Sequence, residues 1–373
     1  MELRNIKLEN LSKISYDCLT QQLLILSQYY CGEYWKVFLE SQIVVNEKYI
    51  HSIKENKPLI FRKNYFDSIH NYYGISITET RGGITFTEEH EVYLAAMKAE
   101  DYPLFVSSFT NHLDHFFIIY GEIEGHYIIN DNYYDISEYI VEKEIIDKNL
   151  VKIYRVMKDY PKVNENQVDL AVNKKVKEFV SDSWNELCKH TLDYNVTNLL
   201  DSIKKISEYI DGTSKILEGY FTDNLYGREC GAILLELSAK INTVFYSVLK
   251  EYIKKDVVEN SFSVKKMNLL STYLETETII KKEVFNIICG ENSLYDVIKK
   301  QIEEFLECEI TENEKLYEAG IEQYSLIALL SYLEIENNLE DIDVMMFTTE
   351  YTFNEVIMKV CKYILVQKIE KIS

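Results

Sequence analysis

The chain has 373 residues, of which 47% are hydrophobic, and its formal net charge is −21. This length allows two or three domains with a substantial core. The acidic balance argues against nucleic acid and against an anionic membrane surface as partners, because both need Lys and Arg to neutralise phosphate, and it is compatible with a cationic small molecule such as an amine.

The N-terminus and the cysteines favour a cytoplasmic location. The first ten residues, MELRNIKLEN, carry charges and lack the apolar core of a signal peptide. No stretch approaches the ~18 consecutive apolar residues of a membrane span. The seven cysteines form no CxxC pair and are odd in number, which favours reduced thiols over a disulfide framework or a zinc site.

Residues 1–160 predict an α+β domain with helices first and an antiparallel sheet later. Apolar residues at helical spacing predict a helix over 18–32, which Gly32 terminates, and another over 87–100, with Thr87 as its N-cap. β-branched and aromatic residues predict strands, and these segments are KPLIF (57–61), GISITET (74–80), PLFVSSF (103–109) and LVKIYRVM (150–157).

The segment HFFIIYGEIEGHYIIND (115–131) predicts a β-hairpin. If Gly121 and Gly125 close a three-residue loop, residue 120 pairs with residue 126, and His115 lies opposite Asp131. Opposed residues share a face, with Cβ atoms about 5 Å apart. The carboxylate can then hold one imidazole nitrogen and leave the other free. Without a nucleophile nearby, the same pattern is only a hairpin with a polar open end.

Strand signals nearly vanish after the polar segment KDYPKVNENQ (158–167). Apolar residues at i, i+3, i+4 and i+7 predict a helical domain over 163–292. The last stretch differs, with three helices separated by a long loop and an acidic loop. We therefore expect three domains, at residues 1–160, 163–292 and 294–373.

A histidine held by an aspartate commonly serves a nucleophile, and the α+β domain offers Cys18 and Cys31. Cys18 lies where a helix is predicted to begin, and the free N–H groups and positive dipole end there stabilise a thiolate. Cys31 lies at the opposite end, where the dipole disfavours a thiolate. We therefore take Cys18, His115 and Asp131 as candidate catalytic residues in a papain-type arrangement. The alternative for Cys18 is a small buried hydrophobe.

Other polar residues near the hairpin are weaker candidates. We interpret His112 and Asp114 as loop residues beside the site, and His126 lies near the turn, far from the open end. The set of His112, Asp114 and His115 does not have the spacing of a recognised metal site. We therefore expect no metal here.

Two segments, DCLTQQLLILSQYY (17–30) and DHFFIIYGEIEGHYIINDNYY (114–134), carry a resemblance to a known family. They resemble the papain-like fold of bacteriocin-processing cysteine peptidases, in which a histidine opens one strand and an aspartate ends the next. The chain is more similar to the cysteine-dependent acyltransferases of butirosin biosynthesis and to the amide synthetases of closthioamide-type assembly. The resemblance covers roughly residues 12–157.

This resemblance implies an amide-forming acyltransferase of thiotemplated secondary-metabolite biosynthesis. Cys18 would take the acyl chain from the phosphopantetheine arm of a carrier protein, and an amine would then accept it. His115 would transfer the protons, and Asp131 would hold the imidazole. No cofactor of the protein's own is implied, because the arm belongs to the partner.

An oxyanion hole is also implied by the resemblance. The Cys18 N–H would supply one donor, and papain-like enzymes take a second from a glutamine shortly before the cysteine. Here the preceding residues, LSKISYD (11–17), contain no glutamine. Ser12, Ser15 or Tyr16 could substitute.

The C-terminal segment that begins KLYEAGIEQYSL (315–326) resembles a peptidyl or acyl carrier protein. Such carriers bear the arm on the serine of GxDSL, at the start of their second helix. Aligned from Gly320, this chain has Gln323 at that position and Ser325 two residues later. Glutamine cannot bear the arm. The resemblance thus implies a carrier-like domain without its prosthetic group, which guides docking or dimerisation; a plain helical cap is the alternative.

Two other functions fit the same residues, a cytoplasmic cysteine peptidase or thioesterase, and a non-catalytic protein that binds a carrier. Access of water to the acyl-enzyme would separate a transferase from a hydrolase, and the helical domain could be the shield. An acidic carrier would need a basic docking patch, for which the best candidate is Lys54, Lys57, Arg62 and Lys63. The alternative for these four residues is a solvated loop.

Overall fold

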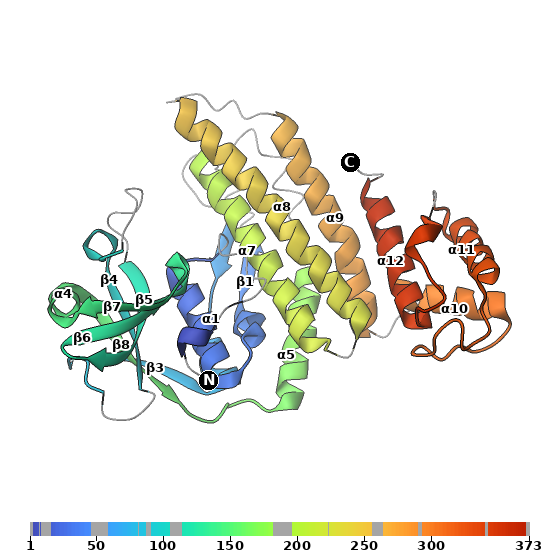
Figure 1. Cartoon of the computed structure of the whole chain (residues 1–373). Helices are drawn as coiled ribbons and strands as arrows, with labels where there is room; N and C mark the ends of the chain where they lie inside the picture. The colour runs from blue at the N-terminus through green and yellow to red at the C-terminus, as the bar shows by residue number, and fades with distance from the viewer. Residues whose placement is uncertain are drawn as a thin grey trace. The chain divides into compact units, whose positions relative to one another are not determined.

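The computed structural model describes residues 3–6, 8, 16–45, 59–80, 82–86, 91–104, 114–181, 196–222, 224–255, 264–289, 293–339 and 342–370. The chain forms two compact units, residues 1–175 with 197–219 and residues 176–196 with 220–373. The expected α+β class is confirmed at this level, with antiparallel sheets in the N-terminal half and helices in the C-terminal half (Figure 1). The finer division into three domains stays a prediction.

A six-stranded sheet in the first unit carries the hairpin of interest (Figure 1). Its strands lie in the order β3-β8-β4-β5-β6-β7, and every neighbouring pair is antiparallel. Their bounds are β3 (Ile75–Glu79), β4 (Val92–Lys98), β5 (Asp114–Ile123), β6 (His126–Asp131), β7 (Ile136–Glu142) and β8 (Leu150–Lys158). A separate two-stranded antiparallel sheet pairs β1 (Gln42–Val45) with β2 (Leu59–Arg62).

Three of the strands expected from sequence are present. The predictions over 57–61, 74–80 and 150–157 correspond to β2, β3 and β8, although residues 57 and 58 lie outside the described residues. The fourth, over 103–109, is not seen as a strand where it is described, because Pro103 and Leu104 form a turn. Residues 105–109 lie outside the described part of the chain.

The helix predicted over 87–100 is wrong in its described part, because Val92–Lys98 forms strand β4 between β8 and β5. Its side chains from Val92 to Met97 are all buried. A central strand covered on both faces has a continuous apolar run rather than an alternating one, and periodicity cannot distinguish such a run from a helix. Thr87 lies outside the described residues.

The β5–β6 hairpin is tighter than predicted. Its turn has two residues, Glu124 and Gly125, whose φ angles of 47° and 79° are those of a type I′ turn. Ile123 pairs with His126, and the register shifts by one residue at a bulge between Ile119 and Gly121.

Beyond the bulge Ile118 pairs with Asn130. Extended to the open end, this register sets His115 opposite Tyr133, two residues from the predicted partner Asp131. A difference of two residues keeps His115 and Asp131 on the same face, because side chains alternate along a strand.

Helix α1 (Cys18–Cys31) packs against β5 and has the predicted ends. It begins at Cys18, and Gly32, in a left-handed conformation with φ 74°, caps its other end. The run Leu23–Leu26 has no solvent exposure. On the sheet, Tyr93, Met97, Phe117 and Tyr127 belong to a buried cluster together with Ile119, Ile129, Ile146 and their neighbours. Helix α1 is therefore anchored in the core of the first unit.

The remaining elements of the first unit surround this centre. They are η1 (Leu3–Asn5), η2 (Trp35–Glu40), α3 (Tyr65–Tyr73), η3 (Ala99–Asp101), η5 (Asn132–Tyr134), α4 (Lys143–Asn149), the start of α5 (Glu165–Ser181) and α7 (Val196–Tyr220). Gly212 lets α7 approach η2 closely, since a Cβ at this position would lie 2.9 Å from the ring of Phe38. Lys175 is buried against Ser41 and stacks over the Tyr209 ring at 4.1 Å. Residues of α7 thus belong to the packing of the sheet-bearing unit.

The second unit is helical. It contains α8 (Leu225–Lys255), α9 (Val264–Cys289), α10 (Leu294–Leu306), α11 (Gln323–Asn337), η7 (Val344–Met346) and α12 (Phe353–Glu370). Helix α8 packs against α9, and α10 packs against α11 and α12. Ser293 and Asp296 form a capping box at the start of α10.

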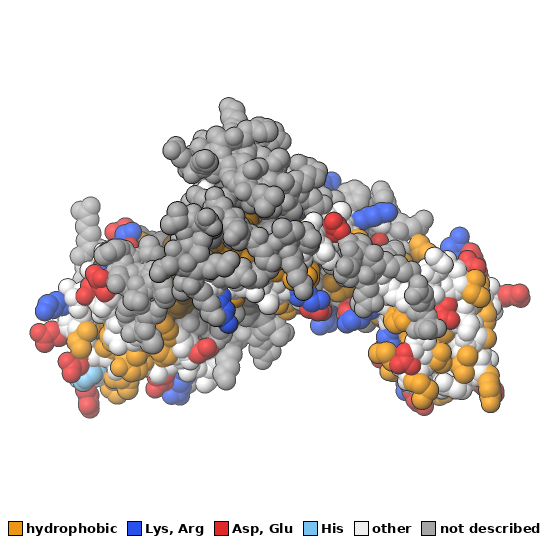
Figure 2. Space-filling view, turned by 90° about the horizontal axis from the view of Figure 1, so that it is seen from above, with side chains coloured by type: hydrophobic (Ala, Val, Ile, Leu, Met, Phe, Trp, Pro, Cys, Tyr) orange, Lys and Arg blue, Asp and Glu red, His pale blue; other side chains and the backbone are white. Residues whose placement is uncertain are grey.

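Within α8, Tyr226–Lys250 is long and apolar enough to cross a membrane by length and composition. Core helices of water-soluble proteins meet the same criteria, so cellular location stays a prediction. In the view of Figure 2, acidic and basic side chains are interspersed over the described surface.

Candidate active site

Cys18 is the first residue of α1, as its sequence context predicts. The N-cap Asp17 is extended, with φ −71° and ψ 166°, and its Oδ1 accepts a hydrogen bond from the Thr20 N–H at 2.8 Å. This bond satisfies one of the free donors of the first turn. The N–H of Cys18 itself has no acceptor within the helix at this position.

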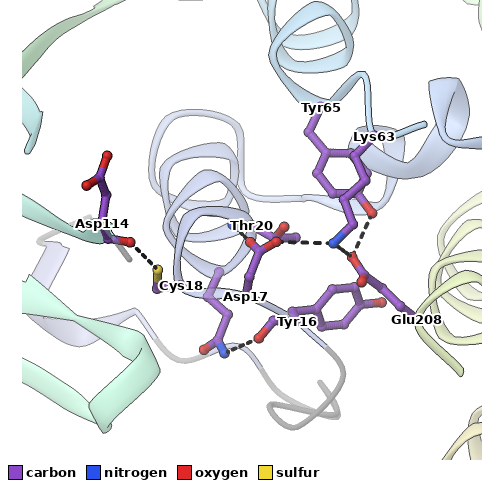
Figure 3. Close-up of polar contacts among 9 residues, drawn as sticks. Tyr16, Asp17, Cys18, Thr20, Lys63, Tyr65, Asp114 and Glu208 are labelled. Carbon is purple, nitrogen blue, oxygen red and sulfur yellow. Dashed lines mark hydrogen bonds and ion pairs between the residues drawn. The ribbon is translucent and has the colours of Figure 1, made fainter. Parts of the chain in front are cut away.

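The sulfur of Cys18 lies against the start of β5. The Phe116 N–H donates to Cys18 Sγ at 3.5 Å, and the thiol can donate to the Asp114 carbonyl at 3.9 Å. Figure 3 shows the sulfur at the start of α1, directed toward Asp114. The cysteine is half-buried. The first turn of the helix therefore presents the thiol to the strand that carries His115.

His115 and Asp131 form the buried pair that the sequence predicts. Their side chains are 5% and 0% exposed, and His115 Nε2 lies 2.7 Å from Asp131 Oδ2. Because Nε2 donates to the carboxylate, Nδ1 is left for the hydrogen bond between His115 and Cys18. The structure thus brings Cys18, His115 and Asp131 together from α1, β5 and β6.

The surroundings of His115 make its imidazole strongly basic. Burial acts to lower the pKa of His115, but the hydrogen bonds that its ring makes to Asp131 and Cys18, and the negative charges of these two groups, outweigh burial and raise the pKa to about 9. His115 is therefore an imidazolium at neutral pH. An imidazolium beside a cysteine stabilises the thiolate, which is the nucleophilic form.

Aromatic rings hold the imidazole in place. Ring centroids of Tyr102, Tyr134 and Tyr133 lie 4.5, 5.2 and 5.7 Å from that of His115. Burial, and then the charge of Asp131, raise the pKa of Tyr102, so its phenol stays neutral. Tyr133 is 44% exposed. The rings of Tyr102 and Tyr134 thus shield the His–Asp pair, while Tyr133 lines the accessible side.

Gln22 is a site residue that the sequence analysis missed. Its Nε2 donates to Asp131 Oδ1 at 3.1 Å and to the Phe116 carbonyl at 3.3 Å. Asp131 Oδ1 also accepts from the Tyr133 N–H at 3.2 Å. The signal was present, since Gln22 lies one helical turn after Cys18 and on the same face of the helix. Its neighbour Gln21 accepts a hydrogen bond from Asn132 at 3.1 Å.

Of the expected second oxyanion donors, only Tyr16 is among the described residues. Its ring is 1% exposed and packs on Phe38 with centroids 5.6 Å apart. Burial and then Asp211 of α7 raise its pKa, and Figure 3 shows the ring pointing away from Cys18. The hydroxyl of Tyr16 is therefore not the donor. Ser12 and Ser15 lie outside the described residues.

The side chains of the two weaker candidates that the structure describes, Asp114 and His126, bond to groups outside the Cys18, His115 and Asp131 set. The Asp114 carboxylate pairs with Lys98 at 2.6 Å, and only its carbonyl faces Cys18. The ring of His126 bonds the Glu124 carbonyl at the turn, at 3.0 Å. His112 lies outside the described residues, and among those that are described no group of three or more His, Cys, Asp or Glu could hold a metal.

The predicted basic patch is described only in part. Lys63 is paired with Asp17 at 3.1 Å and with Glu208 at 2.6 Å, whereas Arg62 is exposed. Lys54 and Lys57 lie outside the described residues. The charge of Lys63 is therefore already engaged within the unit.

In the second unit, Gln323 is the first residue of α11, and Ser325 is exposed in the same turn. Gly320 has φ 81° in the loop before it. Residues 294–370 form, in chain order, α10, a long loop, α11, the short η7 and α12.

No protein-family model matches this chain, and no curated protein matches it.

Proposed function

We propose that this protein is a cysteine-dependent acyltransferase with a papain-like N-terminal domain, which forms amides from carrier-bound thioesters in thiotemplated biosynthesis. The observation that carries the proposal is the hydrogen-bonded series from Cys18 through His115 to Asp131, at the start of a helix. An imidazolium of raised pKa beside the sulfur supplies both a thiolate and a proton donor.

In the first half-reaction the Cys18 thiolate attacks the thioester carbonyl. The N–H of Cys18 stabilises the oxyanion of the tetrahedral intermediate. As the intermediate collapses, the bond from carbon to the arm's sulfur breaks and His115 donates its proton to that sulfur. The products are an acyl-Cys18 thioester, a free thiol on the arm and a neutral imidazole.

In the second half-reaction an amine attacks the acyl-Cys18 thioester. Neutral His115 takes a proton from the amine nitrogen, and Cys18 leaves as a thiolate. The amide is released, and the imidazolium–thiolate pair is restored. Asp131 keeps Nε2 engaged throughout, so that Nδ1 faces the sulfur and the incoming amine. Exchange of one thioester for another is nearly thermoneutral, so the reaction depends mainly on positioning.

The C-terminal helices fit a carrier-like domain that lacks its prosthetic group. Their order and the position of Gln323 at the start of α11 support this proposal. Such a domain would guide docking of the true carrier or dimerisation. Incubation with a phosphopantetheinyl transferase and coenzyme A should leave the mass of the protein unchanged. A gain equal to the arm would refute the loss of the prosthetic group.

The test of the main proposal is the mass of the protein after exposure to an acyl-pantetheine thioester. We expect one acyl group on Cys18, and its transfer to an added amine. Cys18→Ala should abolish both. Cys31→Ala, which removes the other half-buried thiol of the same helix, should retain both.

Two outcomes would favour the alternatives. Loss of the acyl group to water at a rate that the amine leaves unchanged would indicate a thioesterase or peptidase. Absence of any acyl-enzyme, with carrier binding retained, would indicate a binding protein.

A further inference from the structure

The N-cap of the nucleophile helix is the end of a series of charged side chains that begins on α7. Asp17 uses Oδ1 to cap α1, and its Oδ2 accepts from Lys63 Nζ at 3.1 Å. Lys63 Nζ also donates to Glu208 Oε1 at 2.6 Å, and the Tyr65 hydroxyl donates to the same oxygen at 3.2 Å. Figure 3 shows Lys63 between the two carboxylates, with Tyr65 beside Glu208.

Burial along this series fixes the position of the lysine. The side chains of Glu208, Lys63 and Asp17 are 3%, 27% and 50% exposed. Burial raises the pKa of Glu208 to about 7, although Lys63 acts to lower it. The 2.6 Å contact with Glu208 holds the ammonium group of Lys63 at the first turn of α1. Burial acts to lower the pKa of Lys63, but the charges of Glu208 and Asp17 raise it overall, and the lysine stays charged.

The charge of Asp17 needs compensation because the next residue is the nucleophile. Burial acts to raise the pKa of Asp17, but Lys63 and the Thr20 N–H lower it overall, so Asp17 is ionised at neutral pH. A carboxylate beside Cys18 would repel a thiolate. Lys63 offsets this negative charge, so the helix can have a strong cap without that repulsion.

We propose that Lys63 and Glu208 are positioning residues for Cys18, which act through Asp17 to fix the first turn of α1 and to neutralise the charge beside the sulfur. The inference rests on the proposed role of Cys18 as the nucleophile. It gives α7, which follows the sheet-bearing segment in sequence, a direct part in preparing the thiolate.

The test compares Lys63→Met and Lys63→Arg with Lys143→Met, a control that removes a surface lysine paired with Glu122 at 2.8 Å. The rate of Cys18 alkylation by iodoacetamide is measured against pH. Lys63→Met should lower the rate at neutral pH by about tenfold and move the profile to higher pH, since the positive charge that offsets Asp17 beside the sulfur is lost. Lys63→Arg should restore most of the rate, and Lys143→Met should match the wild type.

Hydrogen exchange of the peptide that spans the first turn of α1 gives a readout independent of chemistry at the sulfur. Lys63→Met should speed exchange in this peptide, and Lys143→Met should not. If Lys63→Met does not fold, the double variant Lys63→Met with Glu208→Gln replaces it, because it removes both charges and keeps both shapes.

Unchanged exchange, or an unchanged pH profile, in a folded variant would overturn the positioning role. Wild-type protein in which Cys18 reacts no faster than Cys31 would instead overturn the proposed acyltransferase. The exchange measurement would still decide whether Lys63 fixes the turn.

Discussion

The two ends of α1 each carry a cysteine, and their surroundings are opposite. Cys18 accepts the Phe116 N–H at 3.5 Å and bonds the imidazolium of His115. Cys31, at the other end, donates to the Tyr73 carbonyl at 3.8 Å. Both thiols are half-buried in the same helix. The comparison teaches that position along a helix and the neighbouring strand, rather than burial, distinguish a candidate nucleophile from a bystander thiol.

Asp131→Asn should reduce the difference between Cys18 and Cys31 more than any other substitution. The amide no longer stabilises the imidazolium or fixes Nε2 as the donor, so we expect acyl transfer to fall by about 10²- to 10⁴-fold. Alkylation of Cys18 should slow toward the rate of Cys31. The measurement is kcat/KM with an acyl-pantetheine thioester, together with the two labelling rates.

Glu122→Gln is the matched control for this carboxylate, because Glu122 lies on the same hairpin in a surface pair with Lys143. It should leave transfer and labelling unchanged. An Asp131→Asn variant that also retained full activity would remove Asp131 from the mechanism.

Alkaline pH should also weaken the special environment of Cys18, because that environment depends on the protonated His115. The pKa of His115 is about 9, above its ordinary value of about 6.5. The imidazolium therefore contributes stability that is complete below about pH 6.5 and is lost as the pH rises through about 9. Acyl transfer should decline by about tenfold per pH unit above 9, because the proton donor is lost.

In Asp131→Asn the alkaline limb of acyl transfer should move to lower pH, since the hydrogen bond that raises the pKa of His115 is weakened. A limb that stayed in place would show that another group sets it.

The smallest effect is expected from Gln22→Met. The variant keeps the shape of the side chain but leaves Asp131 Oδ1 and the Phe116 carbonyl without the donor Nε2. We expect a loss of about five- to tenfold in kcat/KM, as for one hydrogen bond of about 1 kcal/mol.

The matched control is Gln28→Met, the same substitution near the other end of α1, which removes only a hydrogen bond to the Gly32 carbonyl at 2.9 Å. It should leave kcat/KM unchanged. Equal losses in the two variants would mean that Gln22 acts through helix stability alone, which thermal unfolding would reveal.

Much of the candidate site could be predicted from sequence because its signals are local. The start of α1 follows from Asp17 and the apolar spacing after it, and the positions of His115 and Asp131 follow from a hairpin whose faces alternate. His115 and Asp131 lie on one face, as predicted, although the predicted turn is one residue longer than the observed one. The catalytic roles themselves stay predictions.

What could not be predicted depends on tertiary packing. The strand β4 is buried on both faces, and its apolar run has no period that would separate it from a helix. The pairing of Lys63 with Glu208 joins residues far apart in sequence. Nothing local marks Glu208 on α7 as a neighbour of the Asp17 cap, and a basic residue such as Lys63 is easily taken for part of a docking patch.

The bulge in β5 keeps His115 and Asp131 on the same face of the hairpin. Between the type I′ turn and the open end, Tyr120 is the extra residue between the Ile119–Ile129 and Gly121–Ile128 pairs. Were the ladder continuous from the turn, His115 would face Tyr134, and Asp131 would project from the opposite side of the sheet. Length changes in this hairpin during evolution would thus be tolerated in steps of two residues, or singly where a bulge absorbs them.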